Sequence, residues 1–355
     1  MIIELDSEYY ALSSSALTRT YEPITHVIFN TIPEDVELSD VDAYCIDLVK
    51  SLGLDPERSA VFLTAADVSK YVHGSKVVDS HLVEVFITIG IDWVSCLDTA
   101  VNIEAGIGNN TINIAVFTDK PLNRLGLLDL FRLASEAKGS LMALLGPTCL
   151  KSPSLGTPSD ATLVASPIGN ERYSGSVGRA AVSLLSEVLA DVFRRLPLDR
   201  YVKYLLGGLS IDELRRLAIE VYRNCRIPTQ NDEDAGLKIL NEILSTFKDP
   251  NIVALIKGAR FIEFLMALNA LPGLMEGEYL SDSPGIIVDE LVGKALAEYV
   301  NGFKGLLSYY WVERLKDEGR LPLLSTLPPI TDDLITSLIG SILSRIYDRY
   351  SRQQP

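Results

Sequence analysis

The chain has 355 residues, 47% of them hydrophobic and 22% charged, so it can bury large apolar cores and is not a disordered chain. Its formal net charge of −15 argues against a nucleic-acid-binding protein, because such proteins neutralise phosphates with lysine and arginine. The length is typical of about two domains of ordinary size.

Short β-branched runs alternate with helical patterns through the first half of the chain. The predicted strands are residues 24–30, 60–64, 83–90, 111–118 and 161–165. The predicted helices are residues 40–52, 125–145 and 178–195. This alternation predicts an α/β domain, in which a mixed sheet is flanked by helices.

The second half contains almost no strand pattern. Ser210 and Glu213 have the spacing of a capping box, and Asp249-Pro250 is typical of a helix start. Residues 287–300 and 331–350 place apolar side chains at helical spacing. We therefore expect an all-α helical bundle after the α/β domain. Turn residues at 197–208 mark the junction, which gives domains of residues 1–200 and 207–355.

The most apolar long window covers residues 252–275. Lys257, Arg260 and Glu263 interrupt it, and each is costly at the centre of a bilayer. The window therefore predicts a buried helix and no membrane span. The first residues lack a basic segment followed by a long apolar run, so we expect no signal peptide.

The four cysteines are Cys45, Cys96, Cys149 and Cys225, and none of them forms a CxxC pair. With only three histidines in the chain, this spacing argues against a zinc site built on close Cys/His pairs. The simple expectation is a cytoplasmic protein with reduced thiols.

Three polar features in the first half are candidates for a site. Asn113 interrupts a strand pattern, so its side chain either faces a pocket or lies in water on an edge strand. Ser135 and Lys138 share one helix face, as a nucleophile and base do, although solvated helix faces show the same spacing. Residues 153–160 form a loop rich in hydroxyls, which suits either a site or a simple turn.

These features belong to an ordered series of motifs. The series is Thr64-Ala65-Ala66-Asp67, Val85-Phe86-Ile87-Thr88-Ile89-Gly90, Thr111-Ile112-Asn113-Ile114, Glu136-Ala137-Lys138 and Gly156-Thr157-Pro158-Ser159-Asp160. Over residues 13–196 the series resembles the adenosylcobinamide amidohydrolase family. The chain departs from that pattern at residues 18–20, at Asn110 and in residues 91–94. The resemblance implies a corrinoid substrate, whose aminopropanol amide is cleaved to leave adenosylcobyric acid.

Amide hydrolysis needs a nucleophile, a base and donors to the developing oxyanion. The candidate nucleophiles or water-orienting hydroxyls are Thr157 and Ser159, and the candidate bases are Asp160 and Glu136. The candidate donors are Lys138 and Asn113.

Two acidic pairs stand out in the helical half. Asp289-Glu290 opens one predicted helix, and Asp332-Asp333 opens the last one. Acidic residues at a helix start are often only caps, which is the alternative for the second pair. Two such pairs in one bundle suggest a shared Mg²⁺ site, because hard divalent ions take carboxylates together with substrate phosphate oxygens.

The helical half also resembles a known family over residues 207–350. The motifs are Gly208-Leu209-Ser210, Asp249-Pro250-Asn251, Ser283-Pro284-Gly285, Asp289-Glu290 with Gly293, Ala297-Glu298-Tyr299, Gly302 with Gly305, and Leu327-Pro328-Pro329 with Asp332-Asp333. They are similar to the archaeal α-ribazole phosphatase family, which is related to phosphatidylglycerophosphatase A. The resemblance implies that Asp289, Glu290, Asp332 and Asp333 bind the metal and activate water, and that Asp282, Lys294 and Lys304 contact phosphate.

Together the two resemblances imply a bifunctional cobamide-salvage hydrolase. It would cleave adenosylcobinamide and dephosphorylate α-ribazole 5′-phosphate, with Mg²⁺ in the phosphatase half and no cofactor identified for the amidohydrolase half. Two alternatives stay open: a corrinoid-binding module without catalysis, and a lipid phosphatase in the second half. The sequence leaves the oligomeric state open.

Overall fold

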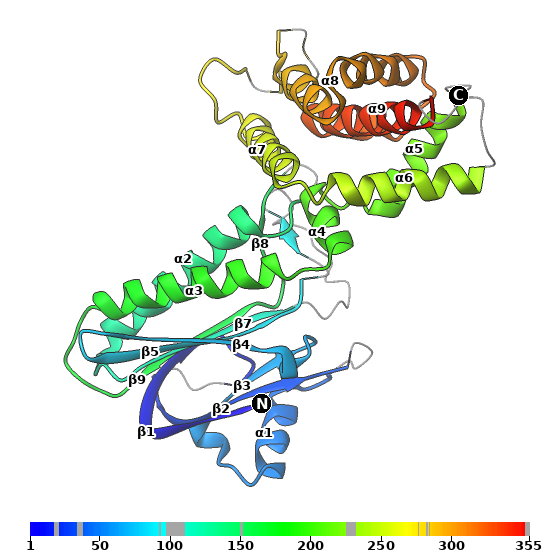
Figure 1. The fold of residues 1–355 in the computed structure, drawn as a ribbon. Coiled ribbons are helices and arrows are strands. Elements are labelled where there is room, and N and C mark those ends of the chain that lie inside the picture. The colour runs from blue at the N-terminus through cyan, green and yellow to red at the C-terminus, as the bar shows by residue number, and fades with distance from the viewer. Residues whose placement is uncertain are drawn as a thin grey trace. The chain divides into compact units, whose positions relative to one another are not determined.

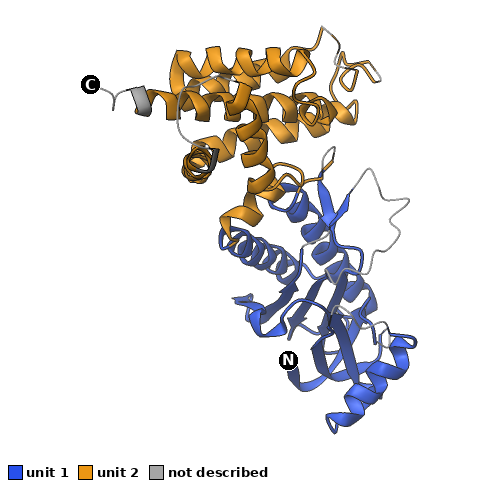
Figure 2. Cartoon of the chain, turned by 90° about the vertical axis from the view of Figure 1, so that its right-hand side faces the viewer, with its two compact units in different colours: residues 1–147, 153–195 blue, residues 148–152, 196–355 orange. Residues whose placement is uncertain are grey.

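The computed structural model describes residues 1–17, 21–33, 38–91, 94–96, 111–149, 152–224, 232–275, 277–281, 283 and 285–351. The chain forms two compact units (Figure 2). Unit 1 consists of residues 1–147 and 153–195, and unit 2 consists of residues 148–152 and 196–355. Each unit has a hydrophobic core of its own.

Unit 1 is built on a seven-stranded mixed sheet with the order β3-β2-β1-β9-β7-β5-β4. The β2–β3 and β7–β9 pairs are parallel and the other neighbours are antiparallel. The strands are β1 (Ile2–Ser13), β2 (Pro23–Thr31), β3 (Ser59–Thr64), β4 (Val72–Val78), β5 (His81–Ile89), β7 (Ile112–Thr118) and β9 (Ala161–Ser166). A separate two-stranded sheet pairs β6 (Ser95–Cys96) with β8 (Ser154–Gly156).

Helices cover this sheet. Helix α1 (Val41–Ser51) packs Cys45 and Val49 against strands β2 and β3. Helices α2 (Arg124–Leu145) and α3 (Ser176–Arg194) lie side by side along the sheet (Figure 1). All seven residues of β7 are buried, as expected of a central strand covered on both faces. The predicted α/β class is confirmed, as are the five predicted strands and three predicted helices.

Two strands of the main sheet were absent from the prediction. Strand β1 has a register shift between Glu4 and Tyr9, which breaks the alternation that marks a strand in the sequence. Strand β4 lies at the sheet edge and contains Gly74, and a Cβ there would lie 3.1 Å from Val188 of α3. Glycine has a low β-propensity, but it is needed at this position because the strand packs closely against a helix.

The named elements of unit 2 in the described part of the chain are all helices, which confirms the predicted class. Its helices are α4 (Leu198–Leu205), α5 (Ile211–Asn224), α6 (Asp232–Thr246), α7 (Pro250–Ala267), α8 (Val288–Asp317) and α9 (Pro329–Ser351). The predicted capping box is present: the Ser210 amide donates to Glu213 at 2.8 Å, and the Glu213 amide donates to the Ser210 hydroxyl at 3.2 Å. Asp249 caps α7 as expected.

Helix α8 folds back on itself. Asn301 and Gly302 have non-helical backbone angles, with φ of +59° at Gly302, a conformation that favours glycine. A Cβ on Gly305 would lie 2.3 Å from the Ala297 carbonyl oxygen, and one on Gly293 would lie 3.2 Å from the Tyr309 ring. In a straight helix Gly293 and Tyr309 would be about 24 Å apart. Residues 288–300 and 303–317 are therefore the two arms of a tight helical hairpin.

No helix in the described part of the chain is long and apolar enough to cross a membrane. The charged residues that interrupt the apolar window lie in α7, where Arg260 and Glu263 are fully buried as an ion pair. This agrees with the predicted buried helix.

The cysteines depart from the prediction. Cys45 is a free buried thiol, whereas Cys96 and Cys149 are disulfide-bonded, so reduced thiols were the wrong expectation for these two. Spacing in the sequence could not show this, because a disulfide joins cysteines that the fold brings together, however far apart they lie along the chain.

Candidate functional site

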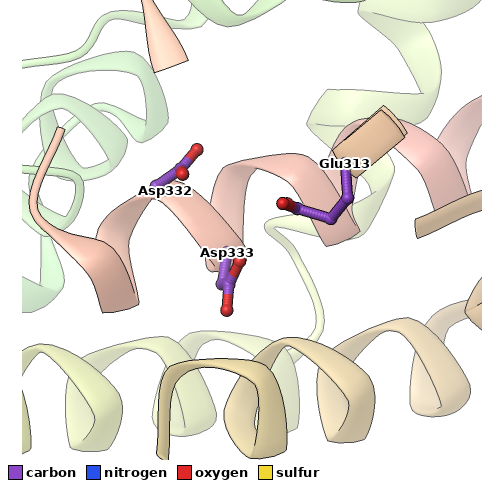
Figure 3. A group of neighbouring side chains, drawn as sticks. All are labelled: Glu313, Asp332 and Asp333. Carbon is purple, nitrogen blue, oxygen red and sulfur yellow. The ribbon is translucent and has the colours of Figure 1, made fainter. Parts of the chain in front are cut away.

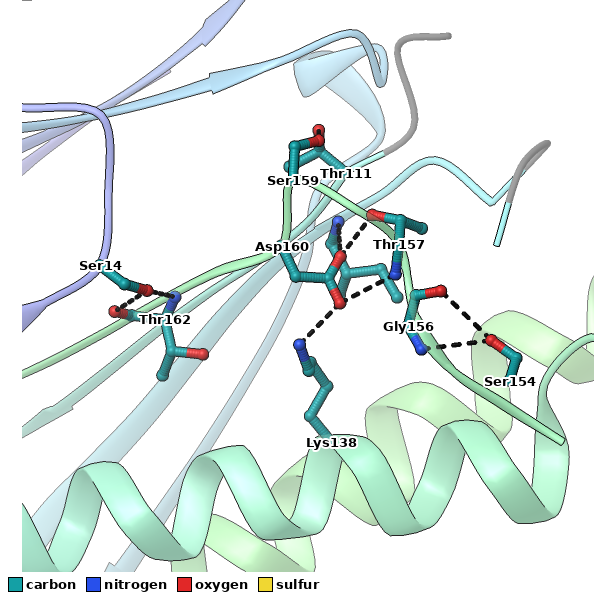
Figure 4. A network of polar contacts seen from close by, with 10 residues as sticks. Ser14, Thr111, Lys138, Ser154, Gly156, Thr157, Ser159, Asp160 and Thr162 are labelled. Atoms are coloured by element: carbon teal, nitrogen blue, oxygen red, sulfur yellow. Dashed lines mark hydrogen bonds and ion pairs between the residues drawn. The ribbon is translucent and has the colours of Figure 1, made fainter. Parts of the chain in front are cut away.

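A buried carboxylate organises a polar cluster at the start of β9 in unit 1 (Figure 4). Asp160 accepts a hydrogen bond from the Lys138 ammonium at 2.6 Å and from the Ile112 amide at 2.8 Å. It also accepts the Thr157 hydroxyl at 2.5 Å and the Thr157 amide at 3.1 Å. The four donors divide two to each oxygen, so the carboxylate is fully satisfied and rigidly held.

Burial strengthens this arrangement. The side chains of Lys138 and Asp160 are 15% and 8% exposed, so their ion pair is poorly screened by water. Lys138 reaches the pair from α2, while Asp160 follows the loop that ends at β9. The cluster therefore depends on α2 packing against this end of the sheet.

Gly156 makes room for the ion pair. A Cβ at this position would lie 2.1 Å from Asp160 Oδ2 and 3.5 Å from Lys138 Nζ. Its φ of +143° is also a backbone conformation that side chains disfavour. Any other residue at Gly156 would push the Asp160 carboxylate out of place.

A second hydroxyl pair lies beside the cluster. The Thr111 and Ser159 hydroxyls are 2.7 Å apart; Thr111 is buried and Ser159 is exposed (Figure 4). Ser159 is thus an exposed residue directly before Asp160, whereas Thr157, which carries the other candidate hydroxyl, is 6% exposed and donates to the carboxylate.

Asn113 lies in the interior, not in water on an edge strand. It is fully buried in β7, and its amide nitrogen donates to the Leu63 carbonyl at 3.3 Å. Its neighbours across the sheet are Thr88 and Ala161, the residue after Asp160. Asn113 Oδ1 and Thr88 Oγ1 are both buried without a hydrogen-bond partner among the described residues. Asn113 is therefore a buried polar group next to the cluster.

Glu136 does not join the Asp160 cluster. It is 58% exposed and pairs with Arg132 at 2.8 Å along α2. Two helical steps separate it from Lys138 by about 200° around the helix axis, so the two side chains face opposite ways. The structure thus brings together Lys138, Thr157, Ser159 and Asp160, with Asn113 on the neighbouring strand.

Unit 2 gathers carboxylates at one end of its helical hairpin (Figure 3). Oxygens of Glu313, Asp332 and Asp333 all lie within 4.8 Å of one another. Both aspartates begin α9, and Glu313 comes from the second arm of α8. Glu313 was not among the residues predicted from the sequence. It lies among several charged residues at the end of α8, and nothing in the sequence distinguishes it from them.

Asp289 and Glu290 begin the first arm of the hairpin. Gly293 lies against Tyr309, and Gly305 lies against Ala297, so the two arms run antiparallel. One helical turn beyond the first of these contacts, the same pairing places Asp289 opposite Glu313. A Cβ on Gly293 would also lie 3.2 Å from the Asp333 Cβ. The four predicted metal-binding residues and Glu313 therefore surround one region, which we call the acidic cluster.

Burial makes the acidic cluster unfavourable without a cation. Desolvation, and then neighbouring carboxylates, raise the pKa of Asp289 to about 6 and the pKa of Asp333 to about 9. Desolvation raises the pKa of Asp332 to about 7, although Lys316 opposes this. Asp289 Oδ1, Glu290 Oε2 and Glu313 Oε1 are buried without a hydrogen-bond partner among the described residues.

Lys316 is the cation of this cluster. Its ammonium lies 2.5 Å from Asp332 Oδ2 and 2.7 Å from Glu313 Oε2. Burial alone would lower the pKa of Lys316, but the Asp332 carboxylate raises it on balance. Of the cations suggested by the sequence, Lys304 pairs with Asp348 instead, and Lys294 lies over the Tyr310 ring.

A buried network fixes the start of α9. Glu263 accepts the Tyr279 hydroxyl at 2.9 Å, the Thr331 amide at 2.9 Å and the Thr331 hydroxyl at 2.6 Å. Tyr279 in turn accepts the Ile330 amide at 3.0 Å. These contacts satisfy two amides that the helix leaves free, directly before Asp332. Arg260 pairs with Glu263 and donates to the Cys149 carbonyl at 2.6 Å.

Some sequence features lie outside the described residues. They are residues 18–20, 92–93 and Asn110, where the chain departs from the first family pattern, together with Cys225, Pro284 and the candidate phosphate contact Asp282.

Comparison with known proteins identifies one family. Residues 1–181 match the family model described as adenosylcobinamide amidohydrolase. The matched segment lies over unit 1 and includes Lys138, Thr157 and Asp160. No curated protein matches the chain.

Proposed function

This chain belongs to the adenosylcobinamide amidohydrolase family, and we propose that unit 1 cleaves the amide joining aminopropanol to the corrin ring of adenosylcobinamide. The products are adenosylcobyric acid and aminopropanol. The observation that carries the proposal is the contact series from Thr157 Oγ1 to Asp160 at 2.5 Å and from Asp160 to Lys138 at 2.6 Å. It joins a hydroxyl, a base and a cation within the matched segment.

In this proposal Asp160 takes a proton from the hydroxyl that attacks the amide carbon, either Thr157 itself or a water held by Ser159. A C–O bond forms, the C–N bond breaks, and the proton passes to the departing amine. Where Thr157 is the attacking group, water then hydrolyses the Thr157 ester, which releases the carboxylic acid and restores the hydroxyl. Lys138 keeps Asp160 oriented and supplies positive charge near the developing oxyanion. Asn113 supports the strand from which Ile112 donates to Asp160.

The test is direct assay of the full chain with adenosylcobinamide. Mass spectrometry should detect adenosylcobyric acid and free aminopropanol in equal amounts. Binding of adenosylcobinamide without release of aminopropanol would instead favour the corrinoid-binding module.

For unit 2 we propose a metal-dependent phosphomonoesterase that acts on α-ribazole 5′-phosphate. The acidic cluster supports this, because buried carboxylate oxygens without donors are the ligands that Mg²⁺ accepts. A bound Mg²⁺ supplies polarisation of the phosphoryl oxygens and a more acidic water. Asp289, Glu290, Glu313, Asp332 and Asp333 are the residues that would hold it.

The chain's own groups favour a phosphate ester at this place. Two helix starts, those of α8 and α9, converge on the cluster, and helix starts favour anions. Lys316 adds a partly buried ammonium to the cluster, and its positive charge favours an anionic substrate. Its raised pKa keeps it positively charged at neutral pH.

Phosphate release measures this second activity. The full chain with Mg²⁺ should release phosphate from α-ribazole 5′-phosphate but not from phosphatidylglycerophosphate in detergent micelles. Release only from the lipid would make unit 2 a lipid phosphatase, and release from neither would reject both activities.

A further inference from the structure

The acidic cluster has two sides. Glu313, Asp332 and Asp333 form the group whose oxygens lie within 4.8 Å of one another (Figure 3). Asp289 and Glu290 stand outside that group, at the start of the other hairpin arm. Asp333 belongs to both sides, because it is a member of that group and its Cβ also lies 3.2 Å from the Cβ position of Gly293, one helical turn after Asp289 and Glu290.

Each side has buried oxygens that still need a positive partner. On the first side this is Glu313 Oε1, and on the second side these are Asp289 Oδ1 and Glu290 Oε2. Asp289 is only 5% exposed, so water does not compensate for the missing partner. One ion within the 4.8 Å group would leave the second side unsatisfied, because neither of its residues belongs to that group.

The charge of the cluster also indicates two ions. The five carboxylates carry a charge of −5 when ionised, and Lys316 contributes +1, which leaves −4. One divalent cation would leave two negative charges that the chain could balance only by keeping protons on carboxylates that are mostly buried. Two divalent cations balance the cluster.

We infer that the acidic cluster binds two hard divalent cations, Mg²⁺ or Mn²⁺, with Asp333 as the ligand shared between them. Glu313 and Asp332 complete one position, and Asp289 and Glu290 complete the other. This inference rests on the proposed phosphatase function and extends it. Phosphate esters are commonly cleaved at pairs of ions about 3.5–4 Å apart, which matches a shared carboxylate.

The inference is tested by metal stoichiometry in the full chain. Chelator-treated protein is titrated with Mn²⁺ by calorimetry, and bound Mn²⁺ is examined by electron paramagnetic resonance. We expect two Mn²⁺ per chain at saturation and a spectrum that shows spin coupling between them. One Mn²⁺ per chain, or two without coupling, would overturn the inference.

Variants separate the two positions. Asp289→Asn should lower the stoichiometry to one and abolish the coupling, and Glu313→Gln should do the same from the other side. Asp348→Asn is the matched control: it removes an acidic side chain of α9 that pairs with Lys304, and it should still bind two ions. Circular dichroism checks that each variant is folded, and the wild-type stoichiometry decides the question even where a variant is not.

Failure of the paired site and failure of the proposed function give different results. Phosphate release from α-ribazole 5′-phosphate with a single bound ion would reject the paired site and keep the phosphatase. Two coupled ions without phosphate release would keep the paired site and reject that substrate.

Discussion

The two units use buried carboxylates in opposite ways. In unit 1, Asp160 has two donors on each oxygen, one of them the Lys138 ammonium. In unit 2, five carboxylates share one ammonium, and three of their buried oxygens have no donor among the described residues. The first site is electrostatically complete within the chain, whereas the second needs an external cation. The comparison teaches that donor count distinguishes an organising carboxylate from a metal ligand.

The largest effect should follow loss of the Asp160 charge. Asp160→Asn keeps the shape of the side chain but removes the proton acceptor, so we expect amide hydrolysis to fall by about 10³-fold or more. Turnover of adenosylcobinamide measures it, and phosphate release by the same preparation should not change. Near-normal amide hydrolysis would remove Asp160 as the base.

Glu136→Gln is the matched control for that variant. Glu136 also lies near Lys138 in the sequence, but its side chain is exposed and paired with Arg132. Its amide hydrolysis should stay within about twofold of wild type, because exposed ion pairs contribute little. A large loss in this variant would show that the exposed face of α2 takes part in the reaction.

Chelation should divide the two activities. Exhaustive treatment with EDTA should abolish phosphate release, because the acidic cluster then lacks its cation. Amide hydrolysis should continue, because all acceptor positions of Asp160 are occupied by donors of the chain. Both activities are measured on one sample before and after Mg²⁺ is restored. Phosphate release that survives chelation would contradict the cation-dependent half of the comparison.

A methyl group at Gly156 should displace the Asp160 carboxylate by steric overlap, without changing any charge. Gly156→Ala places a Cβ 2.1 Å from Asp160 Oδ2, so the carboxylate must move away from Lys138. We expect a loss of about 10²-fold in amide hydrolysis, as misplacement by about 1 Å commonly causes. Gly139→Ala is the control, because a Cβ there meets nothing within 4 Å. Equal activity of the two variants would show that the ion pair is not needed.

The sequence predicted the architecture better than the sites. Strands such as 111–118 and helices such as 178–195 have strong local periodicity, and the structure confirms them. Strand β4 was missed because a glycine needed for helix packing weakens its pattern. The order of the motifs identified Lys138 and Asp160, but it identified Glu136 as a candidate in the same way. It could not separate them, because the orientation of the helix decides which of the two side chains on α2 faces the cluster.

Glu313 and Lys316 were beyond the sequence argument for a different reason. They reach the acidic cluster only because α8 reverses at Asn301 and Gly302. The predicted helix covered only residues 287–300, and a straight continuation of it would place Glu313 about 36 Å from Asp289. The dipeptide Asn301-Gly302 was the available signal, because Asn-Gly is typical of a turn.

Removal of the Glu263 carboxylate should weaken unit 2 selectively. Glu263→Gln leaves the Arg260 guanidinium buried without its negative partner and disturbs the start of α9. Breaking a buried pair costs about 3–5 kcal/mol, so the melting temperature of unit 2 should fall by about 6–20 °C. Tyr279→Phe, which removes one hydroxyl from the same network, should lose only about 1–3 kcal/mol. Equal losses for both variants would argue against the ion pair as the main element.

The smallest effect concerns pH. The pKa values of Asp289, Asp332 and Asp333 are raised to about 6, 7 and 9, mainly by burial, and all lie above the value of about 3.9 in an unfolded chain. The folded protein therefore holds protons that the unfolded chain releases. This contribution to stability is complete below pH 4 and is lost as the pH rises through 6 to 9. In EDTA, the melting temperature of unit 2 should fall across that range.

Magnesium should reverse that trend, because cation binding is favoured when the carboxylates lose their protons. Melting curves between pH 6 and 9, with EDTA or with Mg²⁺, give the two slopes. Asp333→Asn should flatten the slope in EDTA, because it removes the group with the highest of the three pKa values. A melting temperature in EDTA that stays level or rises with pH would mean that the acidic cluster is compensated within the chain. The contrast with Asp160 would then disappear, since both sites would complete their charge balance without a cation.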